Sequence, residues 1–133
     1  MRTRRGLLKS DYLVELAEME GSVSAGGSVQ SDPRELPHLT DVFVVVEVNV
    51  TFDGSASVNP VVELLCSMDG TNFDTEAEQS YEITVSAGST VQKTFRFEVG
   101  SPYYRLRIRN PDSVALTVNG VKVIEYPYRY VPG

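Results

Sequence analysis

The longest regular pattern of apolar residues runs over residues 41–52, DVFVVVEVNVTF. Every second residue from Val42 to Phe52 is apolar, and the residues between them change from apolar (Phe43, Val45) to polar. Successive side chains of a strand point to opposite faces, so this pattern predicts one long strand with a continuous core-facing row. Its first half is apolar on both faces, which indicates that both faces are covered there. A row of this length needs a second sheet to pack against.

Beyond this strand, turn residues recur at the short spacing that is typical of antiparallel β domains. Apolar and polar residues alternate over 58–68, 81–85, 91–99, 103–109, 114–118 and 121–126. Asn119-Gly120 predicts a type I′ hairpin turn between the last two of these segments. We therefore predict an all-β fold, an antiparallel β-sandwich of seven or eight strands. Its topology is jelly-roll or immunoglobulin-like, and the pattern does not decide between the two.

The first forty residues differ from the rest. Residues 10–20 fit a short helix or a strand, residues 21–31 have the composition of a flexible linker, and Pro33 and Pro37 favour an extended path. We predict two parts, an N-terminal arm over residues 1–40 and a β-sandwich domain over residues 41–133. An arm with exposed apolar side chains needs a surface to bind. The residues expected to anchor it on a neighbour are Leu8, Tyr12, Leu13 and Leu16.

Charge is distributed unevenly along the chain. The net charge is −6, so the surface as a whole disfavours nucleic acid and anionic membranes as partners. Residues 1–10 carry four basic side chains and no acid, and residues 11–20 carry four acids and no base. The run Thr3–Lys9 is similar to a twin-arginine export signal, but three acids in the next nine residues interrupt the apolar region that such a signal needs. We expect no export signal and no membrane span.

The sequence contains little that could perform catalysis. His38 is the only histidine and Cys66 the only cysteine, which excludes ordinary zinc sites and internal disulfides. We find no glycine-rich phosphate loop between a strand and a helix, and expect no enzyme activity and no cofactor. The acidic turn at residues 69–74 could bind calcium. Alternatively, Asp69 and Asn72 make turn hydrogen bonds while Gly70 supplies a positive φ.

A row of three arginines is the sharpest polar feature. Arg105, Arg107 and Arg109 alternate along one strand, so their guanidinium groups share one face, and Arg96 on the preceding strand should lie close by. These arginines could pair with glutamates across a solvated sheet, with a small gain per pair. They could also form a docking surface for an acidic partner, because guanidinium forks suit carboxylates.

Two segments carry a resemblance to known proteins. Residues 64–73, LLCSMDGTNF, resemble a strand–turn signature of small β-sandwich modules in tailed-phage virion proteins and carbohydrate-binding domains. Residues 101–110, SPYYRLRIRN, look like the penultimate strand of the same group. Together with the arm, they resemble capsid decoration (cementing) proteins of tailed bacteriophages.

The resemblance implies a non-enzymatic virion structural protein, a capsid decoration protein or another head or tail component. It would be a homo-oligomer located in the virion, with the major capsid protein or another virion protein as its partner. The residues expected to bind that partner are the four arm anchors, Arg105, Arg107, Arg109, and Tyr128 and Tyr130 of the aromatic tail.

A carbohydrate-binding module or receptor-binding adhesin domain is the alternative, with Tyr103 and nearby loops at the sugar. The chain has no tryptophan for a sugar-stacking platform, which disfavours this alternative.

Overall fold

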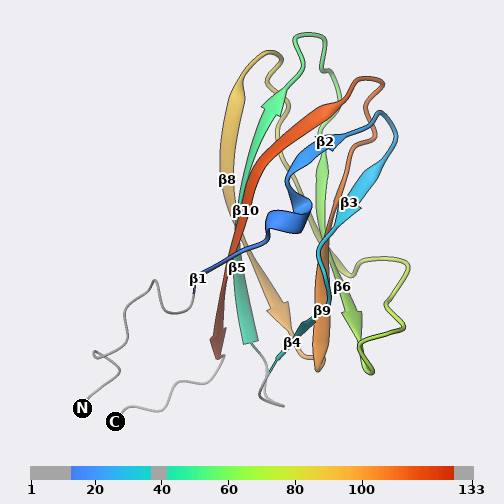
Figure 1. Ribbon diagram of the computed structural model, residues 1–133, viewed down its shortest axis with the longest axis vertical. Helices are drawn as coiled ribbons and strands as arrows, with labels where there is room; N and C mark the ends of the chain where they lie inside the picture. Colours follow the sequence, from blue (N-terminus) through green and yellow to red (C-terminus); the bar gives the residue numbers. More distant parts are fainter. Residues whose placement is uncertain (1–12, 37–41, 128–133) are drawn as a thin grey trace, which may run out of the picture.

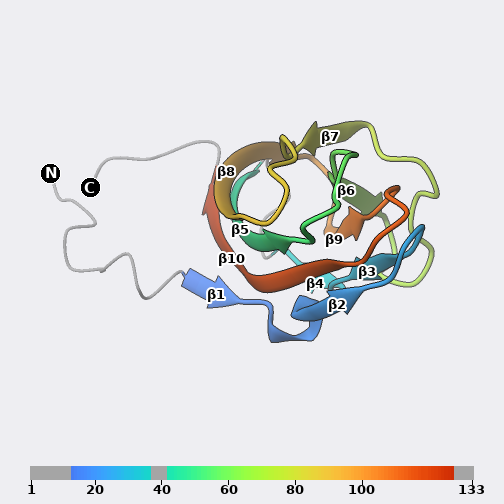
Figure 2. The same ribbon diagram turned by 90° about the horizontal axis from the view of Figure 1, so that it is seen from above.

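The computed structural model describes residues 13–36 and 42–127, which form two antiparallel sheets packed face to face (Figures 1 and 2). In sheet A, β1 (Leu13–Glu15) and β2 (Gly21–Val23) both pair with β10 (Leu116–Pro127), which is followed by β5 (Val42–Phe52) and β8 (Thr90–Val99). In sheet B, β3 (Ser28–Gln30) and β4 (Arg34–Glu35) both pair with β9 (Tyr103–Arg109), which is followed by β6 (Val61–Ser67) and β7 (Gln79–Glu82). One 3-10 turn, η3 (Ala17–Met19), links β1 to β2. The predicted all-β sandwich is confirmed.

The strand pairing is that of a jelly roll. The short strands β1 and β2 share one position at the edge of sheet A, and β3 and β4 share one at the edge of sheet B, so the described chain has eight strand positions. The first position pairs with the eighth, the second with the seventh, the third with the sixth and the fourth with the fifth, all antiparallel. This nested pairing is the jelly-roll arrangement, and it decides between the two topologies left open by the sequence.

The core lies between the sheets and is formed by their inward rows. On β5 the even-numbered residues from Val42 to Phe52 are buried, and the residues between them are half-buried. From sheet B, Tyr104, Leu106 and Ile108 expose no surface. The predicted core-facing row is confirmed. The expected cover on the opposite face of β5 is incomplete among the described residues, because Val45 there is half-buried.

The N-terminal segment is part of the sandwich over its described length, residues 13–36. Its strands complete the free edges of β10 and β9 on the same side of the molecule (Figure 2). Leu16, Met19, Val23 and Leu36 are at most 5% exposed and belong to the core. The prediction of a separate arm is therefore wrong for these residues. Short strands with mixed polarity left no periodic signal, and their position depends on two sheet edges formed far away in the sequence.

Residues 21–31, predicted as a flexible linker, form the corner where the chain crosses from sheet A to sheet B. The backbone N–H of Gly26 donates to the carbonyl of Asp112, and the N–H of Asn110 donates to the carbonyl of Gly27 (3.1 and 2.8 Å). The buried side-chain amide of Asn110 donates to the carbonyls of Val23, Ser24 and Val114. A single buried amide thus holds the corner against the loop that precedes β10.

The predicted hairpin at Asn119-Gly120 is also wrong. Val118 pairs with Val50 and Val121 with Val48, both on β5, so β10 continues past the dipeptide as one strand. Asn119 is the extra residue of a β-bulge, and its side chain donates to the side-chain oxygens of Asn49 and Thr51. Pairing along the whole of β5 outweighs the local preference for a tight turn.

Side chains close the opposite side of the sandwich, where β7 of sheet B lies beside β8 of sheet A. The amide of Gln79 donates to the carbonyl of Glu98 and accepts from its N–H (2.5 and 2.9 Å), as the peptide group of a neighbouring strand would. The hydroxyl of Tyr81 donates to the carbonyl of Arg96. These bonds occupy part of the β8 edge and leave less of it open to edge-to-edge pairing.

Candidate interaction surface

The outer face of sheet A is a regular surface, and β1, β10, β5 and β8 cross it side by side (Figure 1). The register aligns its outward side chains in rows across these strands. One row contains Leu13, Ile124, Val45 and Arg96, and the next contains Glu15, Lys122, Glu47 and Thr94. A further row pairs Tyr126 with Phe43.

The end of this face near the start of β1 is apolar. Leu13 and Tyr126 are each 40% exposed, and Val45 and Ile124 are half-buried. The guanidinium of Arg96 lies 4.4 Å from the centre of the Phe43 ring. An exposed apolar area bordered by charged side chains is typical of protein interaction sites.

The rest of the face is polar and holds a shallow hollow of about 310 Å³, lined by Glu47, Asn49, Gln92, Asn119, Gly120 and Lys122. A chain of side-chain amides crosses it, since Asn119 donates to Asn49 and Asn49 donates to Gln92 (2.8 and 3.3 Å). The amide donors of Gln92 make no hydrogen bond within the described residues, so the hollow can still donate to a bound molecule.

The three predicted docking arginines lie together on the outer face of sheet B, as their alternation predicted. Arg107 donates to Glu63 at 2.6 Å, and Arg109 reaches the same carboxylate at 3.4 Å. Arg105 donates to the carbonyl of Ser31 and lies 4.7 Å from the centre of the Phe73 ring. The contacts of Arg107 and Arg109 are the cross-strand pairing with a glutamate that was the simpler of the two expectations, whereas Arg105 contacts a backbone carbonyl and an aromatic ring instead. Docking of a partner on this row stays a prediction.

The expected closeness of Arg96 to this row is wrong. Arg96 lies on β8 in sheet A, and the three arginines lie on β9 in sheet B. The chain crosses from sheet A to sheet B between β8 and β9, so these two strands are consecutive in the sequence and lie in different sheets.

The other predicted partner-binding residues fall in different places. Leu13 is exposed on the outer face of sheet A, where a partner could reach it. Leu16 is 2% exposed and packs in the core, so its assignment as an anchor for a neighbour is wrong. Leu8, Tyr12, Tyr128 and Tyr130 lie outside the described residues. Ile124, Lys122 and Tyr126 were missed, because the predicted hairpin hid the fact that β10 lies beside β5.

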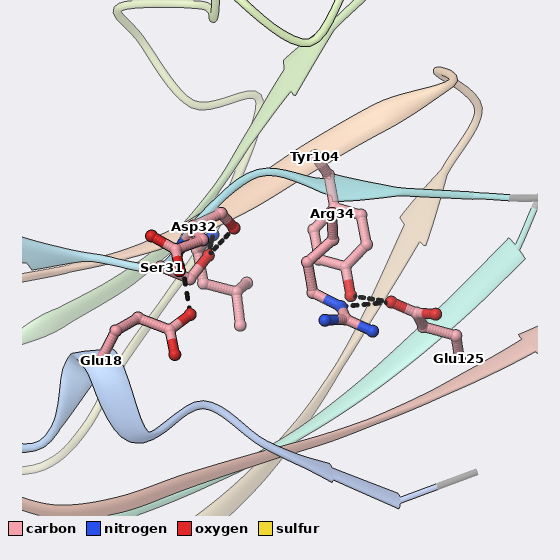
Figure 3. A network of polar contacts seen from close by, with 7 residues as sticks. Glu18, Ser31, Asp32, Arg34, Tyr104 and Glu125 are labelled. Atoms are coloured by element: carbon pink, nitrogen blue, oxygen red, sulfur yellow. Dashed lines mark hydrogen bonds and ion pairs between the residues drawn. The ribbon is translucent and has the colours of Figure 1, made fainter.

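A polar network ties the N-terminal segment to both sheets (Figure 3). The carboxylate of Glu125 on β10 accepts from the Arg34 guanidinium on β4 at 2.7 Å and from the Tyr104 hydroxyl on β9 at 2.6 Å. Burial, together with the nearby charge of Glu125, raises the pKa of Tyr104 far above its ordinary value, so this hydroxyl stays a donor. Beside it, Glu18 in η3 accepts from the backbone N–H of Asp32. The hydrogen bonds of Glu125 with Arg34 and Tyr104 join sheet A to sheet B, and we refer to these contacts as the latch.

Two aspartates hold loops through their carboxylates. Asp69 accepts from the backbone N–H groups of Asn72 and Thr71, and these bonds lower its pKa well below the ordinary value. Gly70 has a φ of +79°, so the turn interpretation of this acidic loop is confirmed. Asp112 accepts from the N–H groups of Ser57 and Val58, which lowers its pKa.

The described residues show few other chemical features. No group of three or more His, Cys, Asp or Glu side chains within residues 13–36 and 42–127 is arranged to hold a metal ion. Burial raises the pKa of the half-buried Cys66 thiol, which disfavours the reactive thiolate. Tyr103, considered as a sugar platform, is half-buried with its ring against Gly70. His38 lies outside the described residues. No helix in the described part of the chain is long and apolar enough to cross a bilayer.

Comparison with solved structures found chains of a similar fold. No protein-family model and no curated protein matches the chain. Two chains from particles of infectious bursal disease virus (IBDV), one from the T13 particle and one from the Gx strain, align over 91% of this chain at 13% identity, with TM-scores of 0.57 and 0.55. This chain spans about a third of their length, with 32% and 33% covered.

A carbohydrate-binding module of Cellvibrio mixtus lichenase 5A, solved with cellotriose, also aligns. Its identity is 8% and its TM-score 0.49, over 84% of this chain and 95% of the module. At 13% identity, the alignments with the two IBDV chains show a shared fold.

Proposed function

We propose that the chain is a non-enzymatic structural component of a virus particle, of the capsid decoration type or another head or tail component. The observation that carries the proposal is the alignment of the jelly roll with chains of a virus over 91% of its length. Jelly rolls form viral capsid domains and lectin domains, and the alignment with virus chains favours the first of these two uses of the fold.

The proposed mechanism is association through several surfaces at once. Contacts of modest area on more than one neighbour add up to a stable assembly, because each contact raises the effective concentration for the next. We assign these contacts to the outer face of sheet A, which includes Leu13, and to residues 1–12 and 128–133, which contain Leu8, Tyr12, Tyr128 and Tyr130. The partners are further copies of the chain and a major capsid or other virion protein.

Light scattering on the purified full chain, coupled to size-exclusion chromatography, tests the proposal. We expect a defined oligomer. Deleting residues 1–12 removes none of the described strands, so the shortened chain should fold and give the same β-rich circular dichroism spectrum. It should form an oligomer of fewer copies than the full chain does. Deleting residues 1–31 would remove β1, β2 and β3 with the buried Leu16, Met19 and Val23, so it is unsuitable as a test. A full chain that is monomeric at every concentration would overturn the proposal.

Glycan binding is a second candidate function, favoured by the amide-lined hollow on sheet A. Side-chain amides with spare donors, beside a carboxylate and an ammonium group, can bind the neighbouring hydroxyls of a sugar. A glycan-array screen of the full chain tests it. Saturable binding that is lost in Asn119→Ala would support this candidate, and an array without binding would remove it.

A further inference from the structure

We propose that the outer face of sheet A binds the same face of a second copy of this chain. The two sheets would stack about a two-fold axis that runs parallel to the strands, between β5 and β10. This inference rests on the proposed function, because it names the surface and the partner of one of the associations proposed above. It follows from the order of the outward side chains in the rows across sheet A.

The apolar row is complementary to itself. Across β1, β10, β5 and β8 it contains Leu13, Ile124, Val45 and Arg96 in that order. Rotation by 180° about the proposed axis reverses the order in the second copy. Ile124 then faces Val45 of the second copy, and Leu13 faces the aliphatic stem of Arg96. Within this row, the aliphatic side chains of Ile124 and Val45 lie at the axis and the charged end of Arg96 lies at each margin.

The charged row is complementary in the same way. Lys122 of one copy faces Glu47 of the second, and Glu47 faces Lys122, so the symmetry creates two opposite-charge contacts. Within the described residues, neither side chain makes an ion pair in its own chain. The net charge of −6 makes two copies repel each other in general. An arrangement that places each Lys122 on a carboxylate of the other copy offsets this repulsion at the contact.

The size of the face fits a stable pair. Four strand positions at a spacing of about 4.8 Å, with a length of about 36 Å for the eleven-residue β5, give a face of roughly 700 Å². Specific interfaces bury about 600–1,000 Å² on each partner, so a stacked pair that uses nearly all of this face reaches the lower part of the usual range. Two stacked sheets lie about 10 Å apart and cross at about 30°, so the contacts nearest the axis, those of Ile124, Val45, Lys122 and Glu47, are the best aligned.

Charge reversal in the full chain tests the inference by sedimentation velocity over a range of concentrations. Lys122→Glu leaves only carboxylates at the two facing positions, and Glu47→Lys leaves only ammonium groups. Each variant alone should raise the dissociation constant of the pair at least about tenfold, because symmetry doubles the like-charge contact. An equimolar mixture of the two variants should associate with an affinity close to that of the unchanged chain. Glu76→Lys and Lys93→Glu, at exposed positions outside this face, make the same changes in net charge and serve as controls.

The mixture separates the proposed contact from effects inside one chain. Lys122 and Glu47 are also cross-strand neighbours within a chain, so each reversal adds repulsion there as well. Mixing cannot relieve that internal repulsion, so recovery on mixing demonstrates the contact between copies. If the mixture stays dissociated, the inference is overturned. If every variant associates like the unchanged chain, this face is excluded while the proposed function stands. A monomeric unchanged chain would overturn both.

Discussion

Leu16 provides the most direct test of whether the N-terminal segment belongs to the sandwich. Its side chain is 2% exposed and packs in the core, while its N–H donates to the carbonyl of Val121 at 2.8 Å. Leu16→Ala removes three buried carbon groups, and at about 0.8 kcal/mol each the loss of burial amounts to roughly 2.4 kcal/mol. The cavity left behind adds to this, so we expect the free energy of unfolding to fall by about 3 kcal/mol, within the usual range of about 2–5 kcal/mol.

Equilibrium urea unfolding measures this change. The chain has seven tyrosines and no tryptophan, so tyrosine fluorescence and far-ultraviolet circular dichroism are the suitable signals. Measurement at low protein concentration keeps association from adding to the apparent stability. Leu13→Ala is the matched control, because it makes the same deletion three residues earlier at a side chain that is 40% exposed. It should cost roughly 1.4 kcal/mol, about half of the loss expected for Leu16→Ala.

The contrast between these two variants decides the question. If residues 13–36 were an arm that leaves the sandwich, both deletions would have similar small effects on stability. A loss below about 1 kcal/mol for Leu16→Ala, or one equal to that of Leu13→Ala, would refute the assignment of this segment to the core.

Three further predictions concern single groups in the sandwich. Tyr104→Phe removes the buried hydroxyl that donates to Glu125 and should lower the free energy of unfolding by about 1 kcal/mol in urea titrations; an unchanged midpoint would show that the latch contributes nothing. Gly70→Ala should lower the free energy of unfolding by about 1–3 kcal/mol, because the residue has a φ of +79° and an added Cβ would lie 3.0 Å from the Tyr103 ring. The control Gly54→Ala, with open space around the added Cβ, should leave the stability nearly unchanged. Equal melting temperatures of the two variants would contradict this prediction. Asp112 has a lowered pKa in the folded state, so its stabilising effect is present above its unfolded pKa of about 3.9 and is lost as the pH falls through the folded value. The gap in urea midpoint between the unchanged chain and Asp112→Asn should therefore be constant from pH 7 to about pH 5 and narrow in stronger acid, and a gap that does not depend on pH would exclude this linkage.

Periodicity predicted the long strands well because each of them buries one complete face. The inward rows of β5, β8 and β9 follow directly from alternation, and so does the common face of Arg105, Arg107 and Arg109. The turn at Asp69-Gly70 was also predicted, since side-chain hydrogen bonds and a positive φ depend on neighbouring residues alone. Each of these features depends only on residues that lie a few positions apart in the sequence.

The candidate site was harder to predict, because it depends on which strands are neighbours. Lys122 and Glu47 are far apart in the sequence and share a row only because β10 pairs with β5 throughout its length. The Asn119-Gly120 dipeptide suggested a hairpin, which would have separated Val121–Tyr126 from β5. Leu16 was read as an exposed anchor because the sequence does not show the sheet edge that covers it.

The sequence by itself determined that this protein is an antiparallel β-sandwich, because alternation along a strand is a local property set by the direction of successive side chains. Only the tertiary structure decided that the sandwich is a jelly roll, that residues 13–36 supply its first two strand positions and that an apolar and charged face lies on sheet A. The physical reason is that edge pairing depends on backbone groups that every residue carries. Hydrogen bonds between distant strands therefore leave little trace in the side-chain pattern, although they determine which side chains meet.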